Sequence, residues 1–234
     1  MAKNQSKSGI EKHKRVNDIL LGPLERPALA YLVKVMPHWV SPDMLTIFGF
    51  LAGVLIGFSY VLTNLDKNFL WLANLGFILN WFGDSLDGNL ARYRKIERPR
   101  YGFFIDHAAD IVSEVFIFLG LALSPFVDFR IAVLALIAYL CMTNLVFLIT
   151  SVEGVFQISY GRLGPTEARV IAMSANTIIY FLGNLQVQLP FGMVSLYNLI
   201  VIGVIILLVS FFSYTTITHG IALSRSDQAA QKKQ

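Results

Sequence analysis

Residues 69–124 read FLWLANLGFILNWFGDSLDGNLARYRKIERPRYGFFIDHAADIVSEVFIFLGLALS, which is two apolar runs on either side of a short basic segment. Each run is close to the roughly 20 residues that a helix needs to span a bilayer. We therefore predict spanning helices at 69–92 and 102–124. Because the connection between them is short, the two helices should be antiparallel neighbours. Five cations crowd this connection: Arg92, Arg94, Lys95, Arg98 and Arg100.

The rest of the chain continues this pattern of long apolar blocks. Of its 234 residues, 55% are hydrophobic and 15% are charged, whereas soluble domains carry about 25% charged residues. A single soluble core is disfavoured, because several blocks are long enough to cross a membrane. We predict an all-α integral membrane protein with six transmembrane helices, preceded by an N-terminal interfacial amphipathic helix. The six are expected at 44–65, 69–92, 102–124, 130–152, 167–187 and 193–222.

The N-terminal residues lack a spanning segment. The first 35 residues hold no continuous apolar run, so no cleavable signal peptide is expected. Residues 16–36 mix apolar and charged side chains, which favours a helix lying in the membrane interface over a simple linker. The predicted organisation is a tail with the interfacial helix at 1–36, a six-helix membrane domain at 37–223 and a C-terminal tail at 224–234.

Charge and cysteine content limit the class of protein further. The net charge is +4, and basic residues gather in the even-numbered connections. The positive-inside rule then predicts that both termini and these connections face the cytoplasm. Such an excess is typical of contact with anionic lipid, and no nucleic-acid partner is expected. The one cysteine, Cys141, excludes an internal disulfide and a cysteine-based metal site.

Carboxylates near the expected cytoplasmic ends of two spans indicate a metal site. Asp84 and Asp87 are three residues apart, and Asp106 and Asp110 are four apart, so each pair shares one helix face. Facing helices would bring four negative charges together, which requires protonation or bound cations. Hard oxygen ligands without a nearby cysteine favour Mg²⁺ or Mn²⁺, with Ca²⁺ less favoured.

Small residues and one arginine accompany the aspartates. Gly88, Ala91 and Gly102 remove side chains where a bulky ligand would approach the backbone. Arg92 lies one turn beyond Gly88 and is suited to binding a phosphate with two hydrogen bonds. The alternatives are helix packing for the small residues and an ordinary cytoplasmic charge for Arg92. All these features together beside four patterned aspartates favour a ligand site.

The resulting pattern is Asp84-x2-Asp87-Gly88-x2-Ala91-Arg92-x9-Gly102-x3-Asp106-x3-Asp110. It resembles the defining motif of the CDP-alcohol phosphotransferases, with eight fixed positions at fixed spacing. The six-span layout with an N-terminal interfacial helix is also similar to this family. The resemblance implies a metal-dependent membrane enzyme of phospholipid synthesis. The 37–223 region would then be its catalytic domain, with the active site on the cytoplasmic side.

The resemblance also implies a role for each matching position. Asp84, Asp87 and Asp106 would bind metal ions, and Asp110 would lie close to them and act as the general base. Gly88, Ala91, Arg92 and Gly102 would surround the CDP part of the donor. The segment Ser41-Pro42-Asp43-Met44-Leu45-Thr46 resembles a family element near the nucleotide. Thr46 matches that element, whereas Asp43 stands where asparagine is usual.

Further polar residues belong to the same expected layer. The stretch 161–169 precedes the fifth expected span, and its Arg162 and Arg169 are predicted to recognise donor or acceptor. Glu114 lies one turn beyond Asp110 and either extends the polar cavity toward the acceptor or satisfies a neighbouring helix. His107 is about 100° off the Asp106–Asp110 face, and we expect it to pack rather than to bind metal.

The substrates remain open at this point. One option is CDP-diacylglycerol with a polar alcohol acceptor, which we favour slightly. The other is a CDP-linked small alcohol with a diacyl lipid acceptor, as in the aminoalcohol branch that Asp106-His107 resembles. Outside this class, a cation transporter or a non-catalytic scaffold would explain acidic membrane helices. The family resemblance also implies a homodimer, although Gly49, Gly53 and Gly57 suit packing inside one chain equally well.

Overall fold

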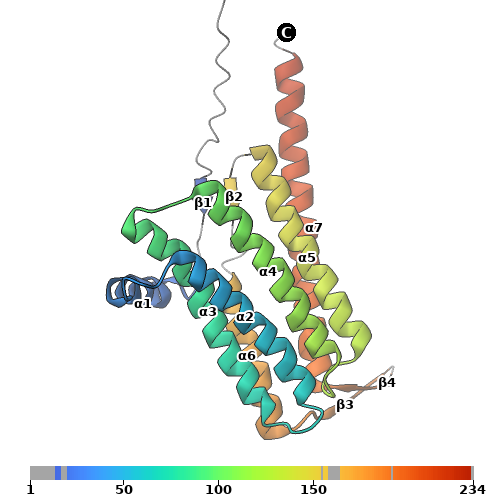
Figure 1. The fold of residues 1–234 in the computed structure, drawn as a ribbon. Helices are drawn as coiled ribbons and strands as arrows, with labels where there is room; N and C mark the ends of the chain where they lie inside the picture. The colour runs from blue at the N-terminus through green and yellow to red at the C-terminus, as the bar shows by residue number, and fades with distance from the viewer. Residues whose placement is uncertain (1–13, 17–19, 154, 158–163, 191, 233–234) are drawn as a thin grey trace, which may run out of the picture.

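The computed structural model describes residues 14–16, 20–153, 155–157, 164–190 and 192–232, and it is helical over most of this length (Figure 1). Helices α2 to α5 coincide within a few residues with the segments expected from the sequence, whereas α6 ends earlier and α7 later than expected, and the all-α class is confirmed. The helices are α1 (Gly22–Val35), α2 (Pro42–Leu62), α3 (Phe69–Arg94), α4 (Pro99–Ala122), α5 (Phe129–Glu153), α6 (Pro165–Leu182) and α7 (Leu196–Gln231).

Two pairs of short strands were not expected. β1 (Lys14–Val16) pairs in parallel with β2 (Val155–Gln157), and β3 (Gln186–Leu189) pairs antiparallel with β4 (Gly192–Ser195). The β3–β4 hairpin lies between α6 and α7, at the opposite end of the molecule from β1 and β2 (Figure 1). Helix α7 then continues past residue 223 to Gln231, so the predicted C-terminal tail begins inside a helix.

Three helices in the described part of the chain are both long enough and apolar enough to cross a membrane. They are α2, α5 and α7, and they make the chain a multi-pass membrane protein. Helices α3, α4 and α6 carry more polar and charged side chains, including Asn80, Asp84 and Arg169. Their crossing of the bilayer therefore stays a prediction.

Helix α2 packs against α3 and α4 at backbone distance. A methyl group added to Gly49 would lie 3.1 Å from Asp84 N, and one added to Gly53 would lie 2.7 Å from Ser113 Cβ. At Gly57 it would lie 2.4 Å from the Phe116 carbonyl oxygen. We call Gly49, Gly53 and Gly57 the glycine stripe. It serves packing inside the chain, because only residues without a side chain allow this approach.

Helix α1 lies across the cytoplasmic ends expected for α2 and α3 (Figure 1). Its Leu29 and Val33 are buried against Leu86 and Leu90 of α3. Its outer face exposes apolar side chains, among them Leu24, which is 75% exposed. This helix occupies most of the segment predicted to be amphipathic, while its position in a membrane interface stays a prediction.

Candidate active site

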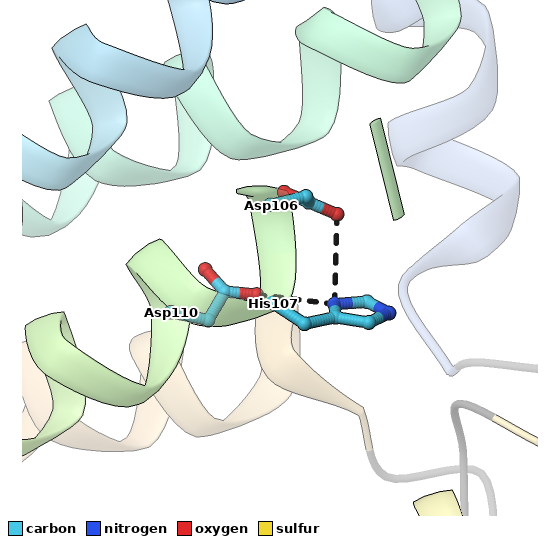
Figure 2. A group of neighbouring side chains, drawn as sticks. All are labelled: Asp106, His107 and Asp110. Carbon is cyan, nitrogen blue, oxygen red and sulfur yellow. Dashed lines mark ion pairs between the residues drawn. The ribbon is translucent and has the colours of Figure 1, made fainter. Parts of the chain in front are cut away.

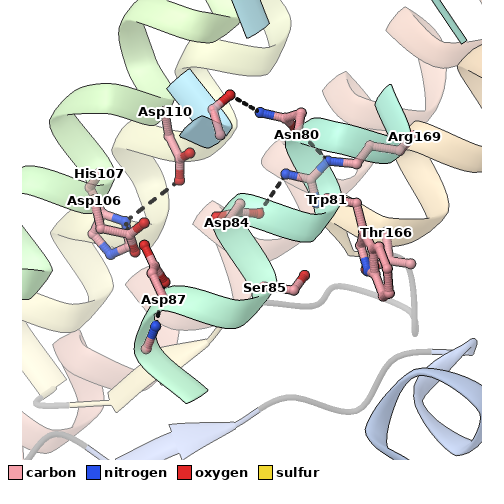
Figure 3. A network of polar contacts seen from close by, with 12 residues as sticks. Asn80, Trp81, Asp84, Ser85, Asp87, Asp106, His107, Asp110, Thr166 and Arg169 are labelled. Atoms are coloured by element: carbon pink, nitrogen blue, oxygen red, sulfur yellow. Dashed lines mark hydrogen bonds and ion pairs between the residues drawn. The ribbon is translucent and has the colours of Figure 1, made fainter. Parts of the chain in front are cut away.

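The four motif aspartates line one large cavity. Asp84 and Asp87 come from α3, and Asp106 and Asp110 come from α4, which faces it. Figure 3 shows all four carboxylates directed into the same space. The cavity has a volume of 1140 Å³ and is also lined by residues of α1, α5, α6 and α7. The spacing argument therefore correctly predicted that two helix faces bring these residues together.

Asp106, His107 and Asp110 form a compact group at the start of α4. Their potential ligand atoms all lie within 4.8 Å of one another. His107 Nδ1 is 3.6 Å from Asp106 Oδ2 and 3.9 Å from Asp110 Oδ2, as Figure 2 shows. Its ring also contacts Phe103 and Phe147, with centroid distances of 4.3 and 5.4 Å. His107 thus packs between aromatic rings, as expected, yet it also joins the carboxylate group.

Asp87 is held in place from two sides. It is 7% exposed, and its Oδ2 accepts a 2.6 Å hydrogen bond from the Thr46 hydroxyl on α2. Its Oδ1 contacts the backbone N–H of Gly88. Thr46 was predicted to contact substrate, whereas in the structure its hydroxyl orients a motif aspartate. This contact joins α2 to α3 at the site.

Asp84 has a cationic partner from α6. Arg169 Nη2 lies 2.5 Å from Asp84 Oδ2, and the two side chains are 13% and 20% exposed. The Arg169 Nε also donates to Asn80 Oδ1 at 2.8 Å, and Asn80 Nδ2 donates to the Gly49 carbonyl at 2.9 Å. Figure 3 shows this chain of contacts. Because an unpaired buried charge is costly, Arg169 compensates Asp84 within the acidic cluster.

This donor set fits a hard divalent cation. Carboxylate oxygens are the preferred ligands of Mg²⁺ and are accepted by Mn²⁺, for which an imidazole nitrogen is also suitable. Asp106 and Asp110 present their oxygens to the cavity together with His107. Asp84 and Asp87 line the same cavity, although one oxygen of Asp84 and both oxygens of Asp87 already accept hydrogen bonds.

The other predicted ligand residues are distributed around this centre. Gly88, Arg92 and Arg169 line the cavity, whereas Thr46, Ala91 and Gly102 are not among its lining residues. A methyl group added to Gly102 would meet nothing within 4 Å, so the backbone is open to approach there. Arg162 lies outside the described residues. Asp43, at the position where asparagine is usual, forms an ion pair with Arg98.

A hydrogen-bonding centre on α1 was missed by the sequence reasoning. Glu25 Oε1 accepts hydrogen bonds from Trp81 Nε1 at 3.0 Å, from Ser85 Oγ at 3.2 Å and from Thr166 Oγ1 at 3.2 Å. Trp81 and Ser85 flank Asp84 on α3, and Thr166 precedes Arg169 on α6. Glu25 therefore fixes α1, α3 and α6 relative to one another beside the Asp84–Arg169 pair. The contacts join residues up to 141 positions apart, so no local spacing indicated them.

The cavity changes character away from the aspartates. Much of the rest of its wall consists of apolar side chains from α4, α5 and α7. We call this part the apolar chamber, and its lining includes Ile117, Phe118, Met142, Val146, Leu207 and Phe211. The whole volume exceeds the roughly 300–1000 Å³ that is usual for small-molecule sites. A ligand with a polar head and a long apolar part would match both ends.

Together, the fold and the site define a multi-pass membrane protein. Its cavity has acidic side chains suited to a divalent cation and also includes the apolar chamber. The chain belongs to the CDP-alcohol phosphatidyltransferase family, because the model of that family matches residues 39–210. The match includes all four aspartates, and it confirms the resemblance inferred from the motif.

Two curated proteins show the same relationship at lower coverage. Over 107 residues, or 43% of the chain, it is 31% identical to cholinephosphotransferase 1 of Gallus gallus. Over 98 residues, or 42% of the chain, it is 34% identical to archaetidylinositol phosphate synthase of Pyrococcus horikoshii. The matched regions span 32% of the first relative and 49% of the second, so the chain corresponds to less than two thirds of either.

Proposed function

We propose that the protein transfers a phospho-alcohol group from a CDP-linked donor to the hydroxyl of an acceptor alcohol and releases CMP. The observation that carries this proposal is the gathering of Asp84, Asp87, Asp106 and Asp110 in one cavity with Arg92. Six of the eight motif positions thus line one cavity, in a chain that belongs to that family. Membership in a family of transferases also favours an enzyme over the cation transporter and the scaffold.

The proposed reaction is a direct displacement at the β-phosphorus of the donor. The acceptor oxygen forms a bond to this phosphorus while the bond to the bridging oxygen breaks, and CMP leaves. Asp110 takes the proton of the acceptor hydroxyl, since a carboxylate beside the attacking group acts as a general base. Gly88, Ala91, Arg92 and Gly102 would surround the CDP part, with Arg92 donating hydrogen bonds to phosphate oxygens.

The divalent cation belongs to the same proposal. Asp84, Asp87, Asp106 and Asp110 would hold Mg²⁺ or Mn²⁺, which when bound neutralises charge on the pyrophosphate oxygens. His107 is added to this set by its contacts with Asp106 and Asp110. Thr46 would orient Asp87 through its hydrogen bond, and Arg169 would orient Asp84 through the ion pair. We propose that Arg162 and Arg169 also contribute charge to substrate recognition.

For the donor we favour CDP-diacylglycerol, so that the transferred group is phosphatidyl. The apolar chamber next to the aspartates supports a lipid substrate, because its walls match acyl chains. A second candidate is an aminoalcohol phosphotransferase that uses a CDP-linked small alcohol and a diacyl lipid acceptor. The similarity to cholinephosphotransferase 1 and the dipeptide Asp106-His107 favour this alternative.

Membrane topology and assembly complete the proposal. We propose six spans formed by α2 to α7, with α1 in the interface and both termini and the active site on the cytoplasmic side. Cys141 is the single cysteine, so a Cys141→Ser background allows single cysteines to be placed at each connection and labelled from one side. We also propose a homodimer. Its contact would use a face other than the glycine stripe of α2, which is occupied inside the chain.

One assay tests the reaction. Purified protein is incubated with Mg²⁺ or Mn²⁺, with CDP-diacylglycerol or CDP-choline, and with a panel of alcohols and diacyl lipids, and CMP is measured. Release of CMP with one pair supports the proposal and identifies both substrates. Absence of release with every pair, while the protein remains monodisperse, would remove the transferase function.

A further inference from the structure

Glu114 carries a buried carboxylate oxygen that no protein group satisfies. Its Oε2 is inaccessible to solvent and has no hydrogen-bond partner among the described residues. The residue lines the cavity and lies four positions after Asp110 on α4. The two carboxylates therefore share a helix face, and they are about 6 Å apart along the helix axis.

Arg169, the cation that could pair with Glu114, already has other partners. Arg169 lines the same cavity, and its guanidinium donates to Asn80 and to Asp84. Ser113 and Tyr139 also line the cavity around Glu114. Glu114 thus lies one helical turn from Asp110, in a cavity whose wall also contains the residues of the apolar chamber.

An unsatisfied buried carboxylate is costly, and such groups in native proteins require an explanation. Here Glu114 lines a cavity that is large enough for a substrate, next to the residue proposed to activate the acceptor. An ionised carboxylate accepts hydrogen bonds and donates none. A hydrogen-bond donor on the ligand would complete the ionised form.

We propose that Glu114 is a specificity-determining residue that binds a second hydrogen-bond donor of the acceptor, while Asp110 receives the reacting hydroxyl. This inference rests on the transferase function proposed above and deepens it. The acceptor is then a small alcohol with at least one further hydroxyl or ammonium group. The lipid part belongs to the CDP-linked donor.

The two candidate acceptors, diacylglycerol and a small polar alcohol, differ in the hydrogen-bond donors that they can offer to Glu114. A diacylglycerol has one hydroxyl, which is consumed at Asp110, and its ester groups only accept hydrogen bonds. It would leave Glu114 Oε2 unpaired, which is costly for a buried carboxylate. A polyol or amino alcohol supplies a donor to each carboxylate. Glu114 thus selects for the polar acceptor and against the lipid acceptor.

The test crosses three forms of the enzyme with two acceptors. The productive acceptor is compared with its analogue that lacks the second donor group, using wild-type protein, Glu114→Gln and Glu114→Ala. With the wild type, removal of the donor group should lower kcat/KM about tenfold or more, which is the usual effect of losing a hydrogen bond to a charged group. With Glu114→Ala the two acceptors should differ by less than about threefold, because their distinguishing contact is gone.

Substrate KM values, a control variant and a check of folding complete the test. The KM for the CDP-linked donor should change little in both variants, while the KM for the acceptor should rise. Glu97→Gln serves as the matched control, because Glu97 is exposed on the α3–α4 connection and lies outside the cavity lining; it should leave both KM values unchanged. Melting temperature and elution profile establish that each variant is folded.

Several outcomes would overturn the inference. The same loss on removing the donor group in wild type and in Glu114→Ala would show that the contact is made elsewhere. A shifted Mn²⁺ half-saturation with an unchanged acceptor KM would make Glu114 a metal ligand instead. Productive transfer from CDP-choline to diacylglycerol would show that the acceptor is a lipid and not a small polar alcohol. In all three cases the wild type still releases CMP, whereas failure of the proposed function itself would leave the wild type silent with every pair.

Discussion

Helix α4 has two neighbourhoods that differ in how closely they are packed. Toward α2, added methyl groups at Gly53 and Gly57 would lie only 2.7 and 2.4 Å from atoms of α4. Toward α5 and α7, α4 borders a cavity of 1140 Å³. The aspartates of α3 and α4 are therefore attached to a closely packed three-helix unit and face open space. Such an arrangement gives the carboxylates fixed positions while leaving room for large substrates.

The largest effect on activity is expected at Asp110, which lines the cavity. Asp110→Asn removes the proposed general base without changing side-chain size, so CMP release should fall about 100- to 10,000-fold. The melting temperature should stay close to that of wild type, because Asp110 faces the cavity and not α2. A CMP-release assay with the productive pair checks this. Full retained activity would contradict the role of Asp110.

The next largest effect is expected at the ion pair between Arg169 and Asp84. Arg169→Gln leaves Asp84 buried without its cation, which should destabilise the protein by about 3 kcal/mol. Thermal unfolding in detergent without divalent cations should show a clearly lower melting temperature. The double variant Asp84→Asn with Arg169→Gln is the control, since it removes both charges and should recover part of the loss. Equal melting temperatures for wild type and Arg169→Gln would mean that the pair contributes no stability.

A smaller effect is expected on the closely packed side. Thr46→Val keeps the shape of the side chain but removes its hydrogen bond to Asp87, a loss of about 1.5–3 kcal/mol for a charged acceptor. Activity should fall because Asp87 is no longer oriented, with a higher Mg²⁺ or Mn²⁺ half-saturation. Thr46→Ser retains the hydroxyl and should behave like wild type. If both variants bind metal equally well, Asp87 does not depend on α2.

The last prediction compares one glycine from each neighbourhood. Gly57→Ala places a methyl group 2.4 Å from the Phe116 carbonyl oxygen, and the forced backbone shift should cost about 1–3 kcal/mol. Gly203→Ala on α7 meets nothing within 4 Å and lines the cavity. It should leave the melting temperature unchanged or slightly higher, because alanine favours a helix by up to about 1 kcal/mol. Similar changes at both positions would remove the contrast between the two sides.

The helices and the aspartate site were predictable because both depend on local patterns. Long apolar blocks place α2 to α5 within a few residues, and the spacing of Asp84, Asp87, Asp106 and Asp110 brings them to facing surfaces. The β3–β4 hairpin was missed, since its few residues lie between two apolar segments that dominate any window of spanning length.

Contacts between distant residues were beyond the reach of such patterns. Thr46 was predicted to contact substrate, while its hydrogen bond goes to Asp87, 41 positions away. The pairing of Arg169 with Asp84 and the three contacts of Glu25 likewise depend on where α6 and α1 dock. His107 was not expected to bind metal, because its angle on the helix lies off the aspartate face, and its ring nitrogen lies near both neighbouring carboxylates.

The glycine stripe of α2 has a consequence for how this protein can change over generations. Almost any side chain at Gly49, Gly53 or Gly57 would push apart the helices that carry the aspartates, so α2 has little freedom to vary. At Gly203 on α7, in the cavity wall, an added methyl group would meet nothing within 4 Å. New substrate preferences should therefore arise by substitution on α5 and α7, and directed evolution toward another alcohol or another lipid should begin its libraries there.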